Sequence, residues 1–564
     1  MISFLEALQR AIVPLVSAAI LVLAFWLSQW SAWWWLLLIP AGPVLLVSLY
    51  DFFQTRWTVA RNYPGAAHIR TLFFNLRPYL RQYIVEGDLE GTPYSFEART
   101  LVYARARGET DTHPFGTERR VDEEGYTWIS HSISPGKDPD MAPRVMVGNE
   151  QSSKPYSASV LNISAMSFGA LSAKAIEALN KGAKTGGFYH DTGEGGLSPY
   201  HLKHGGDIVW ELGSGYFGAR DKDGHFDPGK FADRAQDDRV KMTEIKLSQG
   251  AKPGHGGLLP AAKVTEEIAE TRQVPAFQDC LSPRGHSAFS TPVGMMEFAA
   301  KMRDLSGGKP VGLKLCIGQP HEVMAMMKAM LKTGIYPDFI VVDGGEGGTG
   351  AAPLELSDWV GMPLEPALIM MRNALVGAGI KSKVRLAASG KVYSGMGLAK
   401  NIALGADWCN TARAFMFSIG CIQAERCHLG TCPTGITTQD KWRQRGLVVD
   451  VQAERAARFH KKTVESLADI VAAAGLTEPG ELQPHHLGLR AGLCDVETMI
   501  EKASFLPEGI LVDAPEDTLY AHWWAAADPD SFKPKADLVG LLSAGHPSHS
   551  NSWSRTRQAR GDQG

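Results

Sequence analysis

Hydrophobic and polar positions divide the chain into three kinds of sequence. Between Arg10 and Asp51, forty consecutive residues contain no Asp, Glu, Lys or Arg. From about Ser159 to about Asp450, short apolar runs alternate with Gly-rich loops and amphipathic stretches. From about residue 543 to the end the sequence is polar. Each pattern predicts a different structure.

The uncharged stretch is long enough for two bilayer crossings of roughly 20 residues each. We expect a membrane hairpin within residues 1–50, with helices at 11–27 and 32–49 and a turn at 28–31. Trp30 and three further tryptophans would lie at the far interface, and Pro40 and Pro43 would kink the second helix. Five arginines but only one acid occupy residues 51–81, so the positive-inside rule places the rest of the chain in the cytoplasm, on the inner membrane.

Two other interpretations of this stretch stay open. Residues 11–27 could be the apolar core of a signal peptide, with Arg10 as its charged region, but no small-residue cleavage site follows. A buried hairpin of a soluble protein is the second alternative, but the stretch offers no polar face for it.

The central pattern of strands, Gly-rich loops and amphipathic helices is typical of βα units. Strands are predicted at 160–163, 311–315, 339–342, 384–387 and 407–411, and helices at 171–183, 320–333, 365–376 and 395–404. Residues 185–310 are too irregular to count strands. This number of units favours an α/β fold, a closed (β/α)8 TIM barrel over 156–450, with its active site at the carboxyl ends of the strands.

The flanking regions carry no evident chemistry. Residues 51–155 are expected to form a cytoplasmic adapter with strands at 95–104 and 126–133. A helical region is predicted over 451–542, with helices at 451–474 and 494–503, followed by a disordered tail at 543–564.

Composition narrows the function classes. The 564 residues are 44% hydrophobic with a net charge of −3, which excludes a disordered chain and argues against an electrostatic nucleic-acid binder. Seven cysteines, an odd number with none before residue 280, exclude a secreted disulfide scaffold.

A glycine-rich loop and two short segments follow three of the predicted strands. The loop 344–350 contains Gly344, Gly345, Gly347 and Gly348, and its backbone can approach a planar or phosphorylated ligand closely. It lacks the Gly-Lys-Ser/Thr ending of a P-loop. Two further segments, Ser389-Gly390-Lys391 and Thr411-Ala-Arg413, stand where barrel enzymes bind phosphate, after strands seven and eight. The alternative is that these glycines only form tight turns.

Three cysteines lie within twelve residues. Cys421, Cys427 and Cys432 are spaced by six and five, and Pro433 follows the last, as in many iron-sulfur loops. Three thiols suit a cluster of three irons. A zinc site that also uses His428, or buried inert cysteines, remain alternatives, although the Cys-x2-Cys pairs usual in zinc loops are absent.

Several motifs together resemble one family. They are Ile163-Ser-Ala-Met-Ser-Phe-Gly-Ala170, Thr192-Gly-Glu-Gly-Gly196, Lys246-Leu-Ser-Gln-Gly-Ala-Lys-Pro-Gly-His-Gly-Gly257, the loop from Gly344 to Ala351, and the cysteine loop with its continuation to Gln439. In this order they resemble the FMN-binding barrel of glutamate synthases, in a short form without the amidotransferase domain. The resemblance covers about half of the chain.

The resemblance implies cofactors and a reaction. It implies non-covalent FMN and a 3Fe-4S cluster on Cys421, Cys427 and Cys432. In the family, electrons pass from the cluster to FMN, and reduced FMN delivers hydride to 2-iminoglutarate formed from 2-oxoglutarate and ammonia. The chain would therefore be an oxidoreductase of glutamate biosynthesis.

The resemblance also implies residue roles. Ala165, Met166 and Ser167 would pack on the flavin, and Lys246 and Lys314 would lie near its pyrimidine edge. The catalytic, substrate-facing residues would be Glu194, Gln249 and Lys252. For Glu194 and Lys252 a buried structural ion pair is the alternative role.

The chain also departs from the family. Residue 2 is Ile2, so the amino-terminal cysteine that releases ammonia from glutamine is missing. His255 stands where the family usually has glutamate, and Asp191 where it usually has asparagine. Ammonia would come from solution or from a separate amidotransferase subunit, and electrons from ferredoxin or a membrane redox protein. The alternative function is a membrane-anchored FMN and iron-sulfur relay that acts on a substrate other than a 2-oxo acid.

Overall fold

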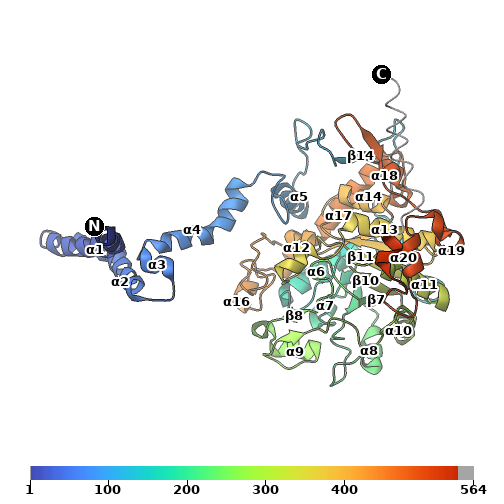
Figure 1. Ribbon diagram of the computed structural model, residues 1–564, viewed down its shortest axis with the longest axis horizontal. Coiled ribbons are helices and arrows are strands. Elements are labelled where there is room, and N and C mark those ends of the chain that lie inside the picture. The colour runs from blue at the N-terminus through green and yellow to red at the C-terminus, as the bar shows by residue number, and fades with distance from the viewer. Residues whose placement is uncertain (1, 544–564) are drawn as a thin grey trace. The chain divides into compact units, whose positions relative to one another are not determined.

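The computed structural model describes residues 2–543, and these residues form two compact units that divide between Ala98 and Arg99. Figure 1 labels many of the elements of both units. The division falls inside the predicted adapter 51–155. The predicted tail 543–564 lies almost wholly outside the described residues.

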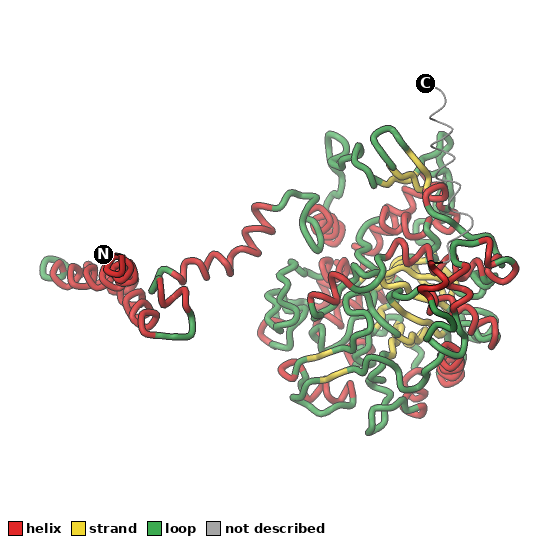
Figure 2. The backbone as a smooth tube through the Cα atoms, in the orientation of Figure 1, coloured by secondary structure: helices red, strands yellow, loops and turns green. Residues whose placement is uncertain are grey.

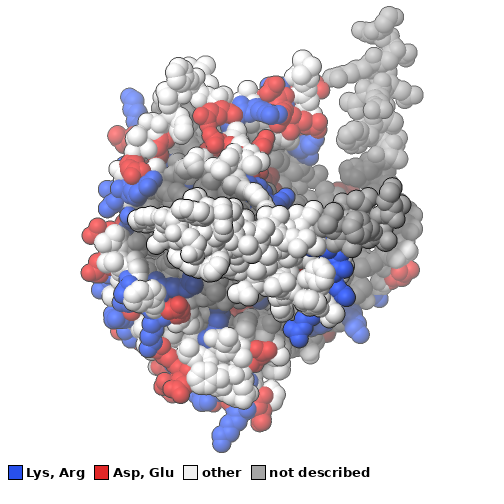
Figure 3. All heavy atoms as spheres, turned by 90° about the vertical axis from the view of Figure 1, so that its left-hand side faces the viewer, with Lys and Arg blue, Asp and Glu red and all other residues white. Residues whose placement is uncertain are grey.

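The N-terminal unit is helical. It consists of α1 (Ile2–Leu27), the 3-10 helix η1 (Ala32–Leu37), α2 (Leu38–Phe53), α3 (Thr58–Asn62), α4 (Ala67–Leu80) and the π-helical turn η2 (Arg81–Val85). The predicted break at 28–31 is confirmed, since the helix stops at Leu27 and Ser31 caps η1. Two windows, Arg10–Leu27 and Ala32–Phe53, are long and apolar enough to cross a membrane. Figure 3 shows the broad band of uncharged atoms on this hairpin.

Eight parallel strands close into a barrel in the larger unit. In chain order they are β4 (Leu161–Ile163), β5 (His190–Asp191), β6 (Ile208–Leu212), β7 (Val240–Lys246), β10 (Val311–Leu315), β11 (Phe339–Asp343), β12 (Arg385–Ser389) and β13 (Trp408–Thr411). The last strand pairs with the first, Asn410 opposite Asn162. Figure 2 shows these strands as the yellow centre of the unit. The TIM-barrel prediction is confirmed.

The periodic segments fold as the sequence predicts. Helices α6 (Ala173–Gly186), α11 (Pro320–Thr333), α13 (Leu364–Gly377) and α14 (Gly395–Ala403) follow their strands, each within three residues of the predicted bounds. The irregular segment 185–310 supplies β5, β6 and β7. Strand β5 has only two residues, too few for a recognisable pattern.

Two segments differ from the prediction. Residues 95–104 were expected to be a strand, but α5 (Phe96–Arg107) is a helix in which Ala98, Val102 and Ala106 are buried at a spacing of four. Ser95 Oγ accepts from the Ala98 amide at its start. Residues 494–503 were expected to be helical, but they form β15 (Val496–Thr498) and a short helix α18 (Met499–Lys502). Thr498 starts α18 because Glu501 completes a capping box with it.

A long C-terminal helix covers one side of the barrel. Helix α17 (Val449–Ala473), predicted at 451–474, packs against α6 and α14. Inside it, His460 Nε2 lies 2.9 Å from Ser159 Oγ, next to the first barrel strand. The barrel core includes Tyr189, Met242 and Trp408, all essentially inaccessible to solvent.

The remaining elements connect or cover these. They are β1 (Thr127–Ile129), β2 (Arg144–Val147), β3 (Tyr156–Ser159), α7 (Pro199–Leu202), α8 (Pro228–Ala235), β8 (Leu258–Leu259), η3 (Ala261–Lys263), α9 (Glu266–Arg272), β9 (Cys280–Leu281), α10 (Pro292–Leu305), α12 (Leu354–Trp359), α15 (Arg413–Ser418), α16 (Lys441–Gln444), η4 (Pro479–Glu481), η5 (Pro484–His486), β14 (Leu487–Arg490), α19 (Ile510–Asp513), η6 (Pro515–Asp517), α20 (Ala521–Ala526) and α21 (Leu538–Ser543).

Candidate active site

A pocket opens at the carboxyl ends of the barrel strands. The loops after β4, β5, β7, β11 and β13 all contribute to its lining, together with the β8–α9 segment and the cysteine loop. This is the face on which TIM barrels carry their active sites. The segments 389–391 and 411–413 follow β12 and β13, the seventh and eighth strands, as expected.

Positive charge gathers around one carboxylate in this pocket. Lys246 Nζ, at the end of β7, lies 3.1 Å from Glu194 Oε1 in the loop after β5. Burial opposes ionisation of Glu194, but attraction to Lys246, Lys252 and Arg272 outweighs it and lowers the pKa of Glu194 to about 2. Burial lowers the pKa of Lys252, and repulsion from Lys246 and Arg272 adds to this effect. Glu194 is thus a carboxylate, and the surplus cations suit an anionic ligand.

The side chain of Lys252 contacts the loop that follows β11. Its side chain is 6% exposed, and Nζ donates to Ala351 O at 3.3 Å. Gln249 and Ser282 line the same pocket. A buried ammonium with a neutral partner at this distance retains the capacity to bind an acid.

A close approach of two loops requires glycine at 250. Its amide donates to Asp343 Oδ2 at 2.7 Å, and a β-carbon there would lie 1.7 Å from Gly344 O. The β7 and β11 loops are thus packed backbone to backbone. In the β11 loop, Gly345 donates to Met362 O, so its amide serves the turn itself.

A second charged cluster lies inside the barrel. Carboxylate oxygens of Asp191, Glu211 and Glu244 lie within 4.8 Å of one another, and Lys314 Nζ is 2.5 Å from Glu211 Oε2. Burial, together with Glu211, raises the pKa of Asp191 to about 7. Burial and Asp191 likewise raise the pKa of Glu244 well above its usual value. Lys314 thus faces the acids of the barrel interior, and it reaches the pocket through Glu211, which lines it.

The cysteine loop borders the same pocket. Cys427 and His428 line it, and Arg413 Nη1 lies 3.9 Å from Cys427 Sγ. Burial raises the pKa of Cys421 to about 11, and the other two thiols contribute to the rise. Burial also opposes ionisation of Cys432, but hydrogen bonds to Thr434 and Thr437 lower its pKa.

The structure brings many of the predicted residues together. Those that line the pocket are Ala165, Met166, Ser167, Glu194, Lys246, Gln249, Lys252, Gly348, Arg413 and Cys427. The predicted residues outside this lining are Lys314, Gly344, Gly345, Gly347, Ser389, Gly390, Lys391, Thr411, Cys421 and Cys432.

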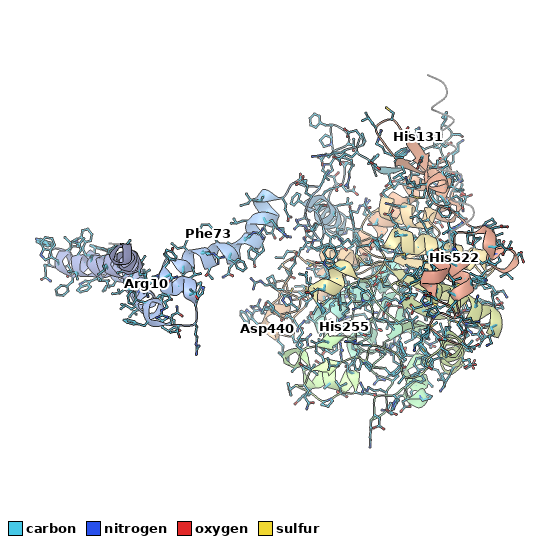
Figure 4. The ribbon with its side chains drawn as sticks, viewed as in Figure 1. Arg10, Phe73, His131, His255, Asp440 and His522 are labelled. Atoms are coloured by element: carbon cyan, nitrogen blue, oxygen red, sulfur yellow. The ribbon has the colours of Figure 1, made fainter. Side chains whose placement is uncertain are left out.

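Three charged residues of the pocket escaped the sequence analysis. Arg272, at the end of α9, donates to Phe168 O at 3.3 Å, and Lys263 Nζ donates to Cys427 O at 2.8 Å. Glu211 is the third. All three come from the irregular segment 185–310, in which no motif marks them. Two further positions, Asp191 and His255, differ from the residues usual in the family that the motifs resemble. Asp191 is buried, whereas His255 is exposed at the rim of the pocket, where Figure 4 labels it.

Comparison with known proteins identifies the family. Residues 137–477 match the family model described as a conserved region in glutamate synthase, which is more than half of the chain. The chain belongs to the glutamate synthase family. It is accordingly an oxidoreductase, and the resemblance inferred from the motifs is confirmed.

Two relatives illustrate the membership. The glutamate synthase large subunit-like protein YerD of Bacillus subtilis is 35% identical over 80% of this chain and 94% of its own length. An archaeal-type glutamate synthase [NADPH] of Thermotoga maritima is 34% identical over 59% of this chain, and the match spans 63% of that relative.

Solved structures align more distantly. A lactate oxidase of Pediococcus acidilactici is 13% identical with a TM-score of 0.41, over 70% of this chain and 92% of the oxidase. A flavocytochrome b2 variant with sulfite bound is 13% identical with a TM-score of 0.39, over 74% and 87%. Family membership therefore rests on the sequence matches.

Proposed function

We propose that this glutamate synthase family member is a membrane-anchored reductive aminase. It converts 2-oxoglutarate, or a related 2-oxo acid, and externally supplied ammonia into the amino acid. The overall change consumes two electrons and two protons and releases one water. The observation that carries the proposal is the convergence of Lys246, Lys252 and Arg272 around Glu194 at the barrel mouth.

The chemistry of the lining fits a phosphorylated, redox-active cofactor. We propose FMN, held by the 165–167 loop, by Gly348 and by the cations Lys246 and Arg413, all of which line the pocket. When bound, FMN supplies hydride-transfer chemistry that no side chain provides. A cation such as Lys246 stabilises negative charge that develops nearby, and its burial makes the effect larger than in water.

The substrate side of the site follows from the remaining charges. A 2-oxo diacid carries two carboxylates, and buried Lys252 is placed to bind one of them in a charge-assisted hydrogen bond. Glu194 stays ionised at neutral pH because of its cationic neighbours. It can therefore orient ammonia or an iminium nitrogen by accepting a hydrogen bond.

The donor set at the cysteine loop fits an iron-sulfur cluster. We propose 3Fe-4S, with Cys421, Cys427 and Cys432 as ligands. The lowered pKa of Cys432 favours the thiolate that metal binding requires. Among the described residues, the sets of groups close enough to hold a single ion do not include this trio. A cluster spaces its ligands more widely, since each sulfur binds a different iron. Zinc with His428 is the competing occupant.

The electron donor follows from the anchor. We propose that α1 and α2 hold the chain in the inner membrane with the catalytic unit in the cytoplasm, where a membrane redox protein or ferredoxin reduces the cluster. The two apolar windows and the five arginines after Asp51 support this.

One experiment tests the proposal. The full chain is purified anaerobically in detergent, its flavin, iron and sulfide are measured, and it is assayed with 2-oxoglutarate, ammonia and chemically reduced ferredoxin. We expect FMN, three irons per chain and glutamate formation. Donor oxidation without glutamate would favour the electron-relay alternative, and zinc without iron would overturn the cluster.

A further inference from the structure

Helix α4 and the turn η2, residues 67–85, present an apolar face to solvent. The face is formed by side chains at helical spacing, and it consists of Ile69, Leu72, Phe73, Leu76, Leu80 and Tyr83, each between 39% and 59% exposed. Positions separated by three and four residues share one side of a helix. Asn75, two residues from Phe73, lies on the opposite side. Figure 4 labels Phe73 on this helix.

Positive charge flanks the apolar face. Residues 52–85 contain five arginines and no acid. Among the described residues, Arg70 and Arg77 have no carboxylate within salt-bridge distance, whereas Arg81 pairs with Glu86. Arginine beside a solvent-exposed apolar face is typical of a helix that lies in the headgroup region of a membrane.

Polar contacts fix the start of α4 at one end of the apolar hairpin. Asp51 Oδ2, at the end of α2, accepts from the Gly65 amide at 2.9 Å and lies 2.9 Å from His68 Nε2. Arg10 Nε, at the edge of the α1 span, donates to Arg61 O at 3.0 Å. In the membrane anchoring proposed above, these charged residues mark the plane where the two spans leave the hydrocarbon. Helix α4 therefore begins at that plane.

We infer that α4–η2 docks on the anionic lipid surface from which the hairpin emerges, with its apolar face in the headgroup boundary and its arginines on lipid phosphates. The inference rests on the membrane anchoring proposed above. Charge favours lipid over a second copy of the chain, because two such helices would set arginine against arginine with no acid between them. Each arginine near an anionic surface adds about 1 kcal/mol, or about fivefold in the ratio of docked to undocked helix.

Spin-label accessibility tests the inference in the full chain. Cys494, the exposed cysteine, is first replaced by serine, and a nitroxide is attached to Phe73→Cys or, as the matched control, to Asn75→Cys. The labelled proteins are reconstituted in phosphatidylcholine vesicles with or without phosphatidylglycerol. Collisions with oxygen, which concentrates in lipid, are compared with collisions with a water-soluble nickel chelate.

With phosphatidylglycerol, we expect the label at 73 to favour oxygen and the label at 75 to favour the chelate. Arg70→Gln with Arg77→Gln should reduce the docked ratio about 25-fold, which is about fivefold for each arginine. Equal chelate access at both positions would overturn the inference and leave the anchoring intact. Shielding of 73 from both reagents would indicate a protein contact and overturn it too. A chain that does not stay with the vesicles would overturn both proposals.

Discussion

Replacing Gly250 by alanine places a methyl group where the backbone of another loop already lies. The new β-carbon would stand 1.7 Å from Gly344 O and 2.7 Å from the Gly344 carbonyl carbon. Backbone cannot rotate away as a side chain can, so the β7 and β11 loops must separate. Their separation also stretches the 2.7 Å hydrogen bond from the Gly250 amide to Asp343.

The magnitude follows from these two effects. Overpacking costs about 1–3 kcal/mol, and loss of a buried hydrogen bond to a charged group costs about 1.5–3 kcal/mol. Together they destabilise the catalytic unit by about 2.5–6 kcal/mol. An unfolding entropy of about 2.1 cal/mol/K per residue over roughly 450 residues corresponds to about 1 °C per kcal/mol, so the melting temperature falls by about 3–6 °C.

Thermal unfolding of the purified full chain, followed by near-ultraviolet circular dichroism, measures this change. The matched control is Gly350→Ala, because a β-carbon at 350 meets no atom within 4 Å. The control should stay within about 0.5 kcal/mol of the parent. If Gly250→Ala and Gly350→Ala melt together, the loops are not packed as described, and the argument fails.

Three further predictions concern the site. Lys252→Ala should raise the KM for the 2-oxo acid about ten- to a hundredfold, since a charge-assisted contact contributes roughly 1.5–3 kcal/mol. Steady-state kinetics measures this change, and Lys252→Arg should recover part of the lost affinity. The flavin content of purified Lys252→Ala should equal that of the parent; a loss of flavin would make Lys252 a cofactor ligand. Cys427→Ser should abolish bound iron and keep FMN, whereas the control Cys494→Ser, at an exposed cysteine, should keep both. Elemental analysis measures the iron and absorbance measures the flavin. Iron retained at parental stoichiometry would contradict the assigned ligand. The pKa of Asp191 is raised from its ordinary value of 3.8 to about 7. Between these two pH values the folded chain holds a proton that the unfolded chain has released. The free energy of unfolding therefore falls as the pH rises through that window. Between pH 5 and pH 8, the melting temperature of Asp191→Asn should fall less than that of the parent. An equal fall would show that Asp191 is not the group responsible.

Local sequence was sufficient for the features that depend on neighbouring residues. The uncharged run after Arg10 determines two apolar helices because it is mostly apolar and contains no charged residue over forty positions. The strand predicted at 339–342 is found at Phe339–Asp343, because its apolar run is unbroken. The helix predicted at 320–333 is found at Pro320–Thr333, because its amphipathic pattern continues over 14 residues. The family motifs likewise lie in short contiguous segments, so their order alone revealed the family.

Only the tertiary structure decided which charges meet. Arg272 and Lys263 come from helices without any motif, and folding brings them to the pocket beside residues about 100 to 165 positions away. The same folding pairs Lys314 with Glu211, 103 residues away, so that Glu211 lines the pocket and Lys314 does not. Side chains of neighbouring barrel strands share the interior according to strand register, which depends on the closure of all eight strands. Sequence specified the residue types for the chemistry, and long-range packing selected which of them share the site.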